Sequence, residues 1–392
     1  MAINEKRVAQ HFRNFQRALS GYTYNEPLSR YLTRFFKENK QMGSSDRKMT
    51  SRFMYNYFRL GNALKEQDLL DKLCFAEFLC ENDSPILSLH HPDLAENIDL
   101  ALENKLQKLQ EKVDFGLTEV FPLIDHLSAS IDTPTFVTSQ FVQPDLFIRI
   151  KRGNEAFVIS ELKTKEILFQ EISTNTLALP NGFRLQDFPK LEGKYEVQDL
   201  SSQKTIDYME ASPNESWWDA CAASGGKALM FLDKNPKINL LVSDIRLSIL
   251  RNLNDRFDKA KVIAPKRQKV LDLTSDTSVI LGKEEFDGII LDVPCSGSGT
   301  WGRTPEMIQQ FSLEKLQEFS NLQKKIASNV VKHLKIGKPL IYITCSVYAD
   351  ENEKVVQYLV DQFGFQIEKM EVIKGFESKA DSMFAARLIR TH

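Results

Sequence analysis

Apolar residues recur at three- and four-residue intervals through the first third of the chain, a spacing typical of amphipathic helices. In one such stretch they are Leu69, Leu70, Leu73, Phe75, Phe78 and Leu79. Prolines are sparse there, so we predict an all-α domain over residues 1–134. The connector at residues 43–46 (Gly-Ser-Ser-Asp) predicts a helix start at which Ser45 or Asp46 caps free backbone amides.

The pattern changes between residues 135 and 205, where short β-rich pieces alternate with turn signals. The pieces are Leu146–Ile150 and Ala156–Ile159, and Pro180–Gly182 is a turn. A loop and a strand then lead into a helix near Gln203. We therefore predict a small α/β module over residues 135–205.

Beyond residue 210, apolar runs alternate with amphipathic helical segments. This alternation predicts an α/β fold with a doubly wound, mostly parallel sheet, which we assign to residues 206–392. The expected strands are Ser216–Cys221, Ile238–Ser243, Lys269–Leu273, Phe286–Asp292 and Pro339–Cys345, with Phe365–Met370 and Met383–Ile389 as a closing hairpin. Ligands of such sheets bind at the carboxyl ends of the strands, so residues that follow the strands are candidates for a site.

Three of these strand ends have features of a nucleoside site. The first strand enters a turn in which Gly225 and Gly226 let the backbone approach a ligand and leave helix-start amides facing it. The second ends at Asp244, about twenty residues farther on, where an acid accepts hydrogen bonds from ribose hydroxyls. The third ends near Asp272, which is placed to meet an adenine amino group.

Each feature alone has a simpler explanation, because tight β-to-α turns use glycine and acids at strand ends often cap helices. The chain has neither a Gly-x-x-x-x-Gly-Lys-[Ser/Thr] phosphate loop nor the Gly-x-Gly-x-x-Gly spacing of a dinucleotide site. S-adenosylmethionine, which carries ribose and adenine but no phosphate, fits the combination better.

Two cysteines fifty residues apart, Cys295 and Cys345, each follow an apolar, β-rich run. If both runs are parallel strands, the two thiols face one crevice. The chain's five cysteines form no Cys-x-x-Cys pair and have no histidine at metal-ligand spacing, so we expect neither disulfides nor a metal site. Packing is the alternative to reactivity, since free cysteine is among the most buried residue types.

The net charge of −2 conceals two blocks of opposite sign. Residues 1–60 carry 12 Lys or Arg against 4 Asp or Glu, and residues 61–130 carry 5 against 14. The basic block is either a solvated helix face or a surface for a polyanion. The start has no apolar signal region and no run of about 18 apolar residues occurs, so we expect a cytoplasmic protein without a membrane partner.

Three groups of residues together resemble the signature set of the RNA (cytosine-5) methyltransferases of the Sun/Fmu type, the RsmB-like and NOL/NOP2/Sun proteins. These groups are Asp219–Lys227 (DACAASGGK), Asp292–Gly299 (DVPCSGSG), and Thr344–Ser346 followed by Glu351–Glu353. Gln198–Gln203 and Arg303–Glu306 are further matches, and the resemblance covers about residues 140–392. More weakly, Asp46–Phe53 is similar to the NusB-like extension of the bacterial 16S rRNA methyltransferases called RsmB.

The resemblance implies a Rossmann-like class I methyltransferase core with S-adenosyl-L-methionine as cofactor and no metal. The cofactor residues that it implies are Cys221, Ala222, Ala223, Gly225, Gly226, Lys227, Asp244, Asp272 and Asp292. Three positions depart from the family pattern: Ser224 replaces a proline, Val293 an alanine and Lys151 an asparagine.

The resemblance also implies an order of catalysis. Cytosine C5 is a poor nucleophile, and a thiolate that adds to C6 activates it. By resemblance Cys345 is that nucleophile and Cys295 assists its release. Asp292 would then bond the N3 and amino edge of cytosine, and Lys227 would bond Asp292 or order the proton-removal step.

The expected partner is RNA, held along its backbone by the small module and the basic block, with the target base out of its stack. The N-terminal similarity favours 16S rRNA over tRNA as substrate, and we expect a monomer. A non-catalytic RNA-binding ribosome-assembly factor is the alternative from another class. DNA cytosine methyltransferases resemble the chain poorly, because they use the Pro-Cys cysteine as nucleophile and lack the Thr-Cys-Ser motif.

Overall fold

The computed structural model describes residues 4–392, which form two compact units. The first unit runs to Asp125 and adds Asp132–Gln143 and Thr300–Ser312; the second comprises His126–Ile131, Pro144–Gly299 and Leu313–His392. The domain boundaries predicted at residues 134 and 205 stay predictions. Within residues 4–392, no helix is both long and apolar enough to cross a lipid bilayer.

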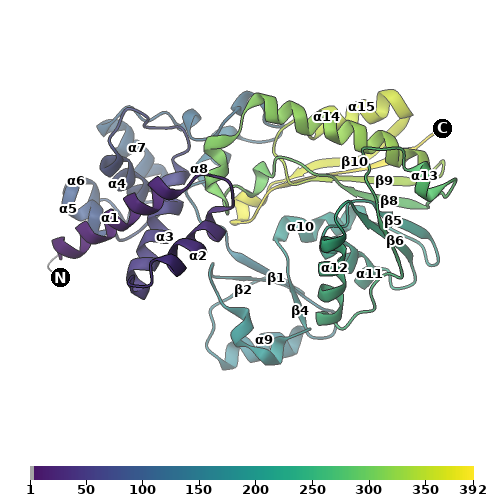
Figure 1. The fold of residues 1–392 in the computed structure, drawn as a ribbon, viewed down its shortest axis with the longest axis horizontal. Coiled ribbons are helices and arrows are strands. Elements are labelled where there is room, and N and C mark those ends of the chain that lie inside the picture. The colour runs from purple at the N-terminus through teal and green to yellow at the C-terminus, as the bar shows by residue number, and fades with distance from the viewer. Residues whose placement is uncertain (1–3) are drawn as a thin grey trace. The chain divides into compact units, whose positions relative to one another are not determined.

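The first unit is helical (Figure 1). Its helices are α1 (Glu5–Gly21), α2 (Leu28–Glu38), α3 (Ser44–Arg59), α4 (Leu69–Cys80), α5 (Pro85–His90), α6 (Pro92–Ala95), α7 (Leu102–Lys112) and α8 (Thr133–Ser139), with short 3-10 turns at Leu117–Glu119 and Pro305–Gln310. Buried aromatic rings join α1 to α3, where Phe15 and Phe53 meet edge to face. The Glu306 carboxylate accepts a hydrogen bond from the Leu28 amide at 3.0 Å, and so satisfies a free amide at the start of α2.

The start of α3 differs in part from the prediction. Gly43 is the N-cap residue, and its amide donates to the Asp46 carboxylate at 3.3 Å. The prediction is therefore right for Asp46, although this side chain acts from inside the first turn. It is wrong for Ser45, whose hydroxyl accepts a hydrogen bond from Arg7 instead.

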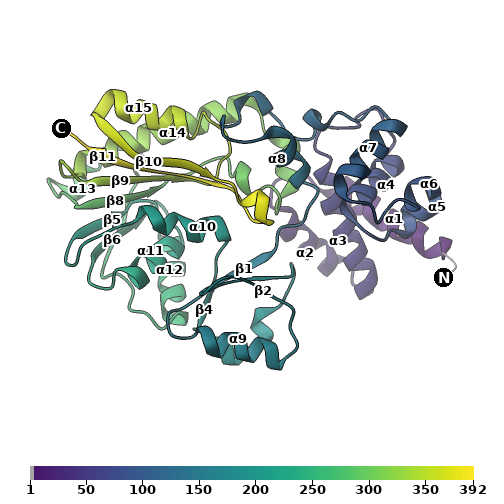
Figure 2. The ribbon, with the colours of Figure 1, turned by 180° about the vertical axis from the view of Figure 1, so that it is seen from behind.

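The small module has an antiparallel four-stranded sheet with α9 on one side (Figure 2). In sheet order its strands are β2 (Gln170–Ser173), β3 (Thr176–Leu179), β1 (Leu146–Ile150) and β4 (Tyr195–Val197). Its helices are α9 (Glu155–Thr164) and α10 (Leu200–Lys204). Short 3-10 turns lie at Leu185–Asp187, Pro189–Leu191 and Thr205–Tyr208. The strand predicted at Ala156–Ile159 is wrong, because these residues lie in α9. Val158 and Leu162 are both buried, and their spacing of four residues places them on one helix face.

The seven-stranded sheet confirms the predicted doubly wound, mostly parallel architecture. Its strands are β5 (Ser216–Asp219), β6 (Asn239–Asp244), β7 (Arg267–Val270), β8 (Gly288–Asp292), β9 (Pro339–Thr344), β10 (Phe365–Ile373) and β11 (Met383–Arg390), in the order β10-β11-β9-β8-β5-β6-β7. Strands β5 to β9 are parallel to their neighbours in this group, and β11 runs antiparallel between β9 and β10. The predicted hairpin is present, while β7 ends before the predicted Leu273.

Helices cover both faces of this sheet (Figure 1). On one face lie α11 (Gly226–Lys234) and α12 (Leu247–Lys259), and on the other α14 (Leu313–Val330) and α15 (Glu353–Phe363); α13 (Ser278–Leu281) is a single turn before β8. The strand order reverses between β5 and β8, where doubly wound sheets place their ligands.

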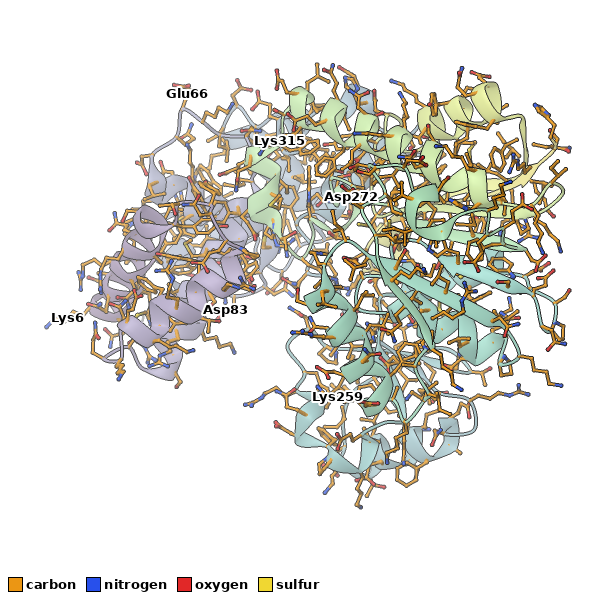
Figure 3. All side chains as sticks on the ribbon, turned by 45° about the vertical axis from the view of Figure 1, so that its right-hand side comes forward. Lys6, Glu66, Asp83, Lys259, Asp272 and Lys315 are labelled. Atoms are coloured by element: carbon orange, nitrogen blue, oxygen red, sulfur yellow. The ribbon has the colours of Figure 1, made fainter. Side chains whose placement is uncertain are left out.

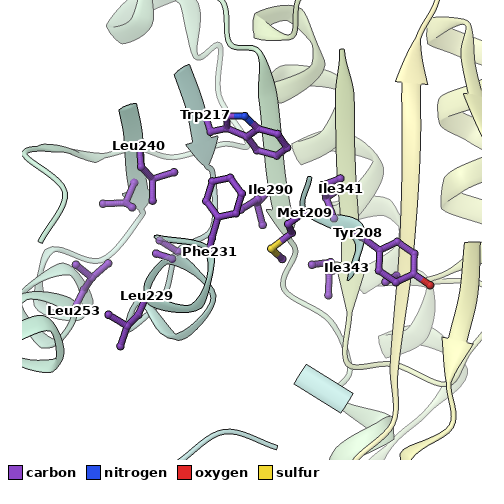
Figure 4. Packing of buried hydrophobic residues seen from close by; sticks show 14 of the residues in the cluster. Tyr208, Met209, Trp217, Leu229, Phe231, Leu240, Leu253, Ile290, Ile341 and Ile343 are labelled. Atoms are coloured by element: carbon purple, nitrogen blue, oxygen red, sulfur yellow. The ribbon is translucent and has the colours of Figure 1, made fainter. Parts of the chain in front are cut away.

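Large apolar side chains fill the space between the sheet and α11 (Figure 4). Trp217 on β5 packs against Phe231 on α11, with ring centroids 4.9 Å apart. Gly288 opens β8 beside this indole, and a Cβ atom there would lie 2.4 Å from the Trp217 ring. This close packing fixes β5 against β8, and with them the two strand ends at the point of reversal.

Candidate active site

The two predicted cysteines meet at the carboxyl ends of β8 and β9. These strands are parallel neighbours, with Asp292 opposite Ile343, so the loops that follow them leave the sheet side by side. The Sγ atoms of Cys295 and Cys345 are 3.3 Å apart, and the Cys345 amide donates to the Cys295 sulfur at 3.4 Å. Both are free, half-buried thiols. The hydrogen bond with Cys345, together with burial, raises the pKa of Cys295 and favours its thiol form.

A lysine and a carboxylate form an ion pair at the same edge of the sheet. Lys227 lies in the first turn of α11 and Asp292 ends β8, and Nζ and Oδ2 are 2.6 Å apart. Burial favours the neutral amine, but Asp292 raises the pKa of Lys227, and negative charge on Cys345 acts in the same direction. The Lys227 side chain is only 12% exposed and that of Asp292 27%. The Lys227 ammonium is thus held beside Asp292 and interacts electrostatically with Cys345.

The turn between β5 and α11 has the shape expected for close approach of a ligand. Gly225 has φ +80°, and a Cβ atom there would lie 2.6 Å from Leu253. It is the N-cap residue of α11 and provides no side-chain cap, so amides at the helix start are available to a ligand. Ser224 in this turn accepts a hydrogen bond from the Arg256 guanidinium at 3.4 Å, which connects the turn to α12.

The other predicted cofactor residues differ in their surroundings. Cys221, Ala222 and Ala223 form the turn itself, and burial raises the pKa of the Cys221 thiol. Asp244 ends β6 as predicted and accepts hydrogen bonds from Arg246. Asp272 (Figure 3) is two residues beyond β7 and exposed, and its carboxylate accepts hydrogen bonds from the Thr274 amide and hydroxyl. Its contact with an adenine ring remains a prediction without structural support.

Asp219 is a site residue that we did not assign from the sequence, although it opens the first motif. It ends β5 and is 1% exposed, and within residues 4–392 neither carboxylate oxygen has a hydrogen-bond partner. Burial and the nearby Asp292 raise its pKa to about 8, against the opposing effect of Lys227. Unsatisfied buried carboxylates are costly, and they are found mostly where function requires them.

Asp219→Asn is expected to be more stable than the wild type by an amount that grows as the pH rises. Native Asp219 keeps its proton up to about pH 8, whereas the unfolded chain releases it near its ordinary pKa of 3.8. Between these values the native state binds the extra proton, so the free energy of unfolding falls with rising pH, by up to about 1.4 kcal/mol per pH unit for this group. The variant's advantage should grow from pH 5 to pH 8.

Urea unfolding of the cofactor-free protein at several pH values measures this effect. Asp272→Asn is the matched control, because hydrogen bonds from Thr274 lower the pKa of that exposed acid. Its difference from the wild type should stay constant above pH 5. An Asp219→Asn difference that is equally constant would show that Asp219 is ionised throughout.

The second part of the chain matches a known family of sequences. Residues 207–389 match the family model described as 16S rRNA methyltransferase RsmB/F. Ribosomal RNA small subunit methyltransferase B of Xylella fastidiosa (strain 9a5c) is 34% identical over 188 residues, which are 48% of this chain and 42% of that protein. The protein of the same name from Yersinia enterocolitica is 29% identical over 226 residues, 55% of this chain and 50% of its own length. The chain thus spans about half the length of these curated relatives.

Solved structures support the fold class. The crystal structure of PH0851 covers all of this chain and all of its own, with a TM-score of 0.72 and 19% identity. The structure of NSun6 from Pyrococcus horikoshii with SFG covers 69% of this chain and 97% of its own, with a TM-score of 0.56 and 16% identity. The predicted Rossmann-like core with a helical N-terminal region is confirmed by the sheet order and by these likenesses.

Proposed function

We propose, starting from the RsmB/F methyltransferase domain that residues 207–389 match, that this protein is an RNA cytosine-5 methyltransferase that uses S-adenosyl-L-methionine and acts on 16S rRNA. The observation that carries the proposal is the 3.3 Å separation of Cys295 and Cys345 beside the pair of Lys227 and Asp292. A methyltransferase that acted on an exposed amine or hydroxyl group would need no thiol nucleophile. Two thiols in contact fit a reaction in which one adds to a base and the other assists its departure.

The residues around the strand reversal fit S-adenosylmethionine. The free amides at the start of α11 suit its carboxylate, and Asp244 suits the ribose hydroxyls. Asp219 has no hydrogen-bond partner among the residues that the structure describes, and an ammonium or hydroxyl group of the ligand, or water beside it, would supply one. When bound, the cofactor supplies the electrophilic methyl group.

Cys345 acts first in the proposed reaction. Its thiolate adds to C6 of the cytosine, a C6–Sγ bond forms, and the electron pair of the C5–C6 bond becomes available at C5. Lys227, whose pKa is raised by Asp292, places an ammonium charge near the reacting atoms. Asp292 accepts a hydrogen bond from Lys227 with one oxygen, and its exposed surface can accept another from the amino group at the N3 edge of the base.

Cys295 acts last. After C5 carries the new methyl group, its proton leaves to a base, the electron pair re-forms the C5–C6 double bond, and the C6–Sγ bond breaks. Cys295, held as a thiol beside Cys345, donates a hydrogen bond to the departing sulfur. This step frees the RNA and returns Cys345 as the thiolate and Cys295 as the thiol.

A cleft of about 790 Å³ between the small module and α12 supports the RNA-binding part of the proposal. Phe183, Phe188 and Tyr195 line it together with Lys259 and with Arg256, which also pairs with Glu196 at 2.9 Å. Aromatic faces stack on unpaired bases, and cations pair with phosphates. The target cytosine must leave its stack to reach the two thiols, so a single-stranded segment beside it is available to such a cleft.

The alternative is an RNA-binding assembly factor without catalysis, and calorimetry with S-adenosylmethionine separates the two. We expect cofactor binding by the wild type, about tenfold weakened or more in Asp244→Asn, because a ribose hydrogen bond to a charged group is lost. Methylation of 16S rRNA or of tRNA by the purified protein then identifies the substrate. Absence of cofactor binding would favour the assembly factor.

A further inference from the structure

A buried carboxylate connects the two loops that carry the cysteines. Glu351 is fully buried, and its carboxylate accepts hydrogen bonds from the Ser296 amide at 2.8 Å and from the hydroxyls of Ser296 and Ser346. Ser296 directly follows Cys295, and Ser346 directly follows Cys345. One side chain therefore holds the residue after each thiol, although Glu351 does not bond either sulfur itself.

Further hydrogen bonds join the same two loops. The Ser298 and Ser346 hydroxyls are 3.1 Å apart, and the Val347 amide donates to the Ser298 hydroxyl at 2.9 Å. The Gly299 amide donates to the Cys345 carbonyl, also at 2.9 Å. These bonds limit how far the loops can move apart once Glu351 has set their spacing.

The position of Glu351 is itself fixed from the sheet and from α14. Gln323 on α14 donates to the Glu351 carboxylate at 2.9 Å and to the Pro294 carbonyl at 3.0 Å. Tyr342 on β9 donates to the Glu351 carbonyl at 2.7 Å. The carboxylate is thus held in place by rigid elements on both sides of the loops.

Burial of the Glu351 carboxylate is unfavourable for the free energy of folding. Burial raises the pKa of Glu351, although hydrogen bonds from Ser296 and Ser346 oppose the shift. The groups that bond this carboxylate, from Ser296, Ser346 and Gln323, are all uncharged. A well-packed apolar side chain often stabilises an interior better than such a group, so its presence points to a requirement of the site.

We propose that Glu351 is a positioning residue that sets the separation of the Cys295 and Cys345 sulfurs. The inference rests on the proposed two-thiol reaction. In that reaction, Cys345 must reach C6 of the base while Cys295 stays close enough to assist its departure. Glu351 sets the spacing of the sulfurs through Ser296 and Ser346, and its charge also raises the pKa of Cys295.

Kinetics of Glu351 variants test the consequence for catalysis. Glu351→Ala should lower kcat by about 10²-fold, the effect of misplacing reacting groups by about 1 Å, while the KM for RNA and the Kd for S-adenosylmethionine change by less than about threefold. Glu351→Gln should retain most of the activity, because the serine hydroxyls can rotate to accept hydrogen bonds from its amide. Glu353→Ala is the matched control, since Glu353 contacts Ser128 and neither cysteine loop.

Disulfide formation tests the positioning without any methyl transfer. Diamide takes two electrons and two protons from Cys295 and Cys345 and is reduced to the hydrazine, leaving one S–S bond that peptide mass spectrometry identifies. The bond should form readily in the wild type, in Glu351→Gln and in Glu353→Ala. It should form about tenfold more slowly in Glu351→Ala, because the two sulfurs are then held out of position. Ser346→Ala should also slow it, which keeps the test valid if Glu351→Ala folds poorly.

The two measurements separate the inference from the proposed function. Slower crosslinking in Glu351→Ala and Ser346→Ala supports the positioning role even if the wild type transfers no methyl group to RNA. Crosslinking at the wild-type rate in both variants overturns it, whatever the methylation assay shows. A kcat loss with unchanged crosslinking would likewise assign Glu351 to another role.

Discussion

Cys345→Ala is expected to lower the rate of methyl transfer to RNA by about four orders of magnitude or more, as removal of a catalytic nucleophile does in other enzymes. Without the thiolate, no bond forms at C6 and cytosine C5 keeps its poor reactivity. Transfer of radioactive methyl groups from S-adenosylmethionine to RNA measures the rate. Binding of RNA and cofactor should change little, because the variant removes one sulfur and leaves Lys227 and Asp292 paired.

Cys80→Ala is the control for this experiment. Cys80 is a free thiol at the end of α4 in the helical unit, and its replacement should leave the rate unchanged. Methyl transfer by Cys345→Ala at the wild-type rate would contradict the assigned nucleophile. A rate lost equally in Cys80→Ala would indicate damage to the fold.

Cys295→Ala is expected to trap the protein on its RNA. The variant still adds Cys345 to C6, but it lacks the thiol that lies 3.3 Å away and assists departure. A covalent protein–RNA adduct that survives denaturant should therefore accumulate when S-adenosylmethionine is present. Labelled RNA that migrates with the protein on a denaturing gel measures it.

The double variant Cys295→Ala, Cys345→Ala provides the comparison, because it retains neither thiol. No adduct should form with it. An adduct in the double variant, or none in Cys295→Ala, contradicts the division of labour between the cysteines. An adduct in Cys345→Ala but not in Cys295→Ala would reverse the two roles.

Much of the sheet could be predicted from the sequence, because buried parallel strands are short continuous apolar runs. The runs at Phe286–Asp292 and Pro339–Cys345 place both cysteines correctly at strand ends. The secondary structure of Ala156–Ile159 could not be predicted in the same way, since a four-residue apolar run fits a strand or a buried helix face equally well. In the structure, Val158 and Leu162 are buried four residues apart on one face of α9.

The features that the sequence did not show depend on contacts between distant residues. The spacing of Asp219 from Asp292 is set by β5 pairing with β8, and no local pattern reveals that its carboxylate has no partner. Glu351 bonds Ser296, which lies fifty-five residues earlier in the sequence. The segment Thr300–Ser312 belongs to the helical unit, although it follows the cysteine loop directly.

Bisulfite sequencing of total RNA tests the central claim most directly. RNA from cells that lack the protein is compared with RNA from the same cells supplied with the wild type or with Cys345→Ala. The account predicts one or more cytosines in 16S rRNA that resist conversion only with the wild type. Identical conversion in all three RNA samples, or protection that Cys345→Ala restores, would contradict it.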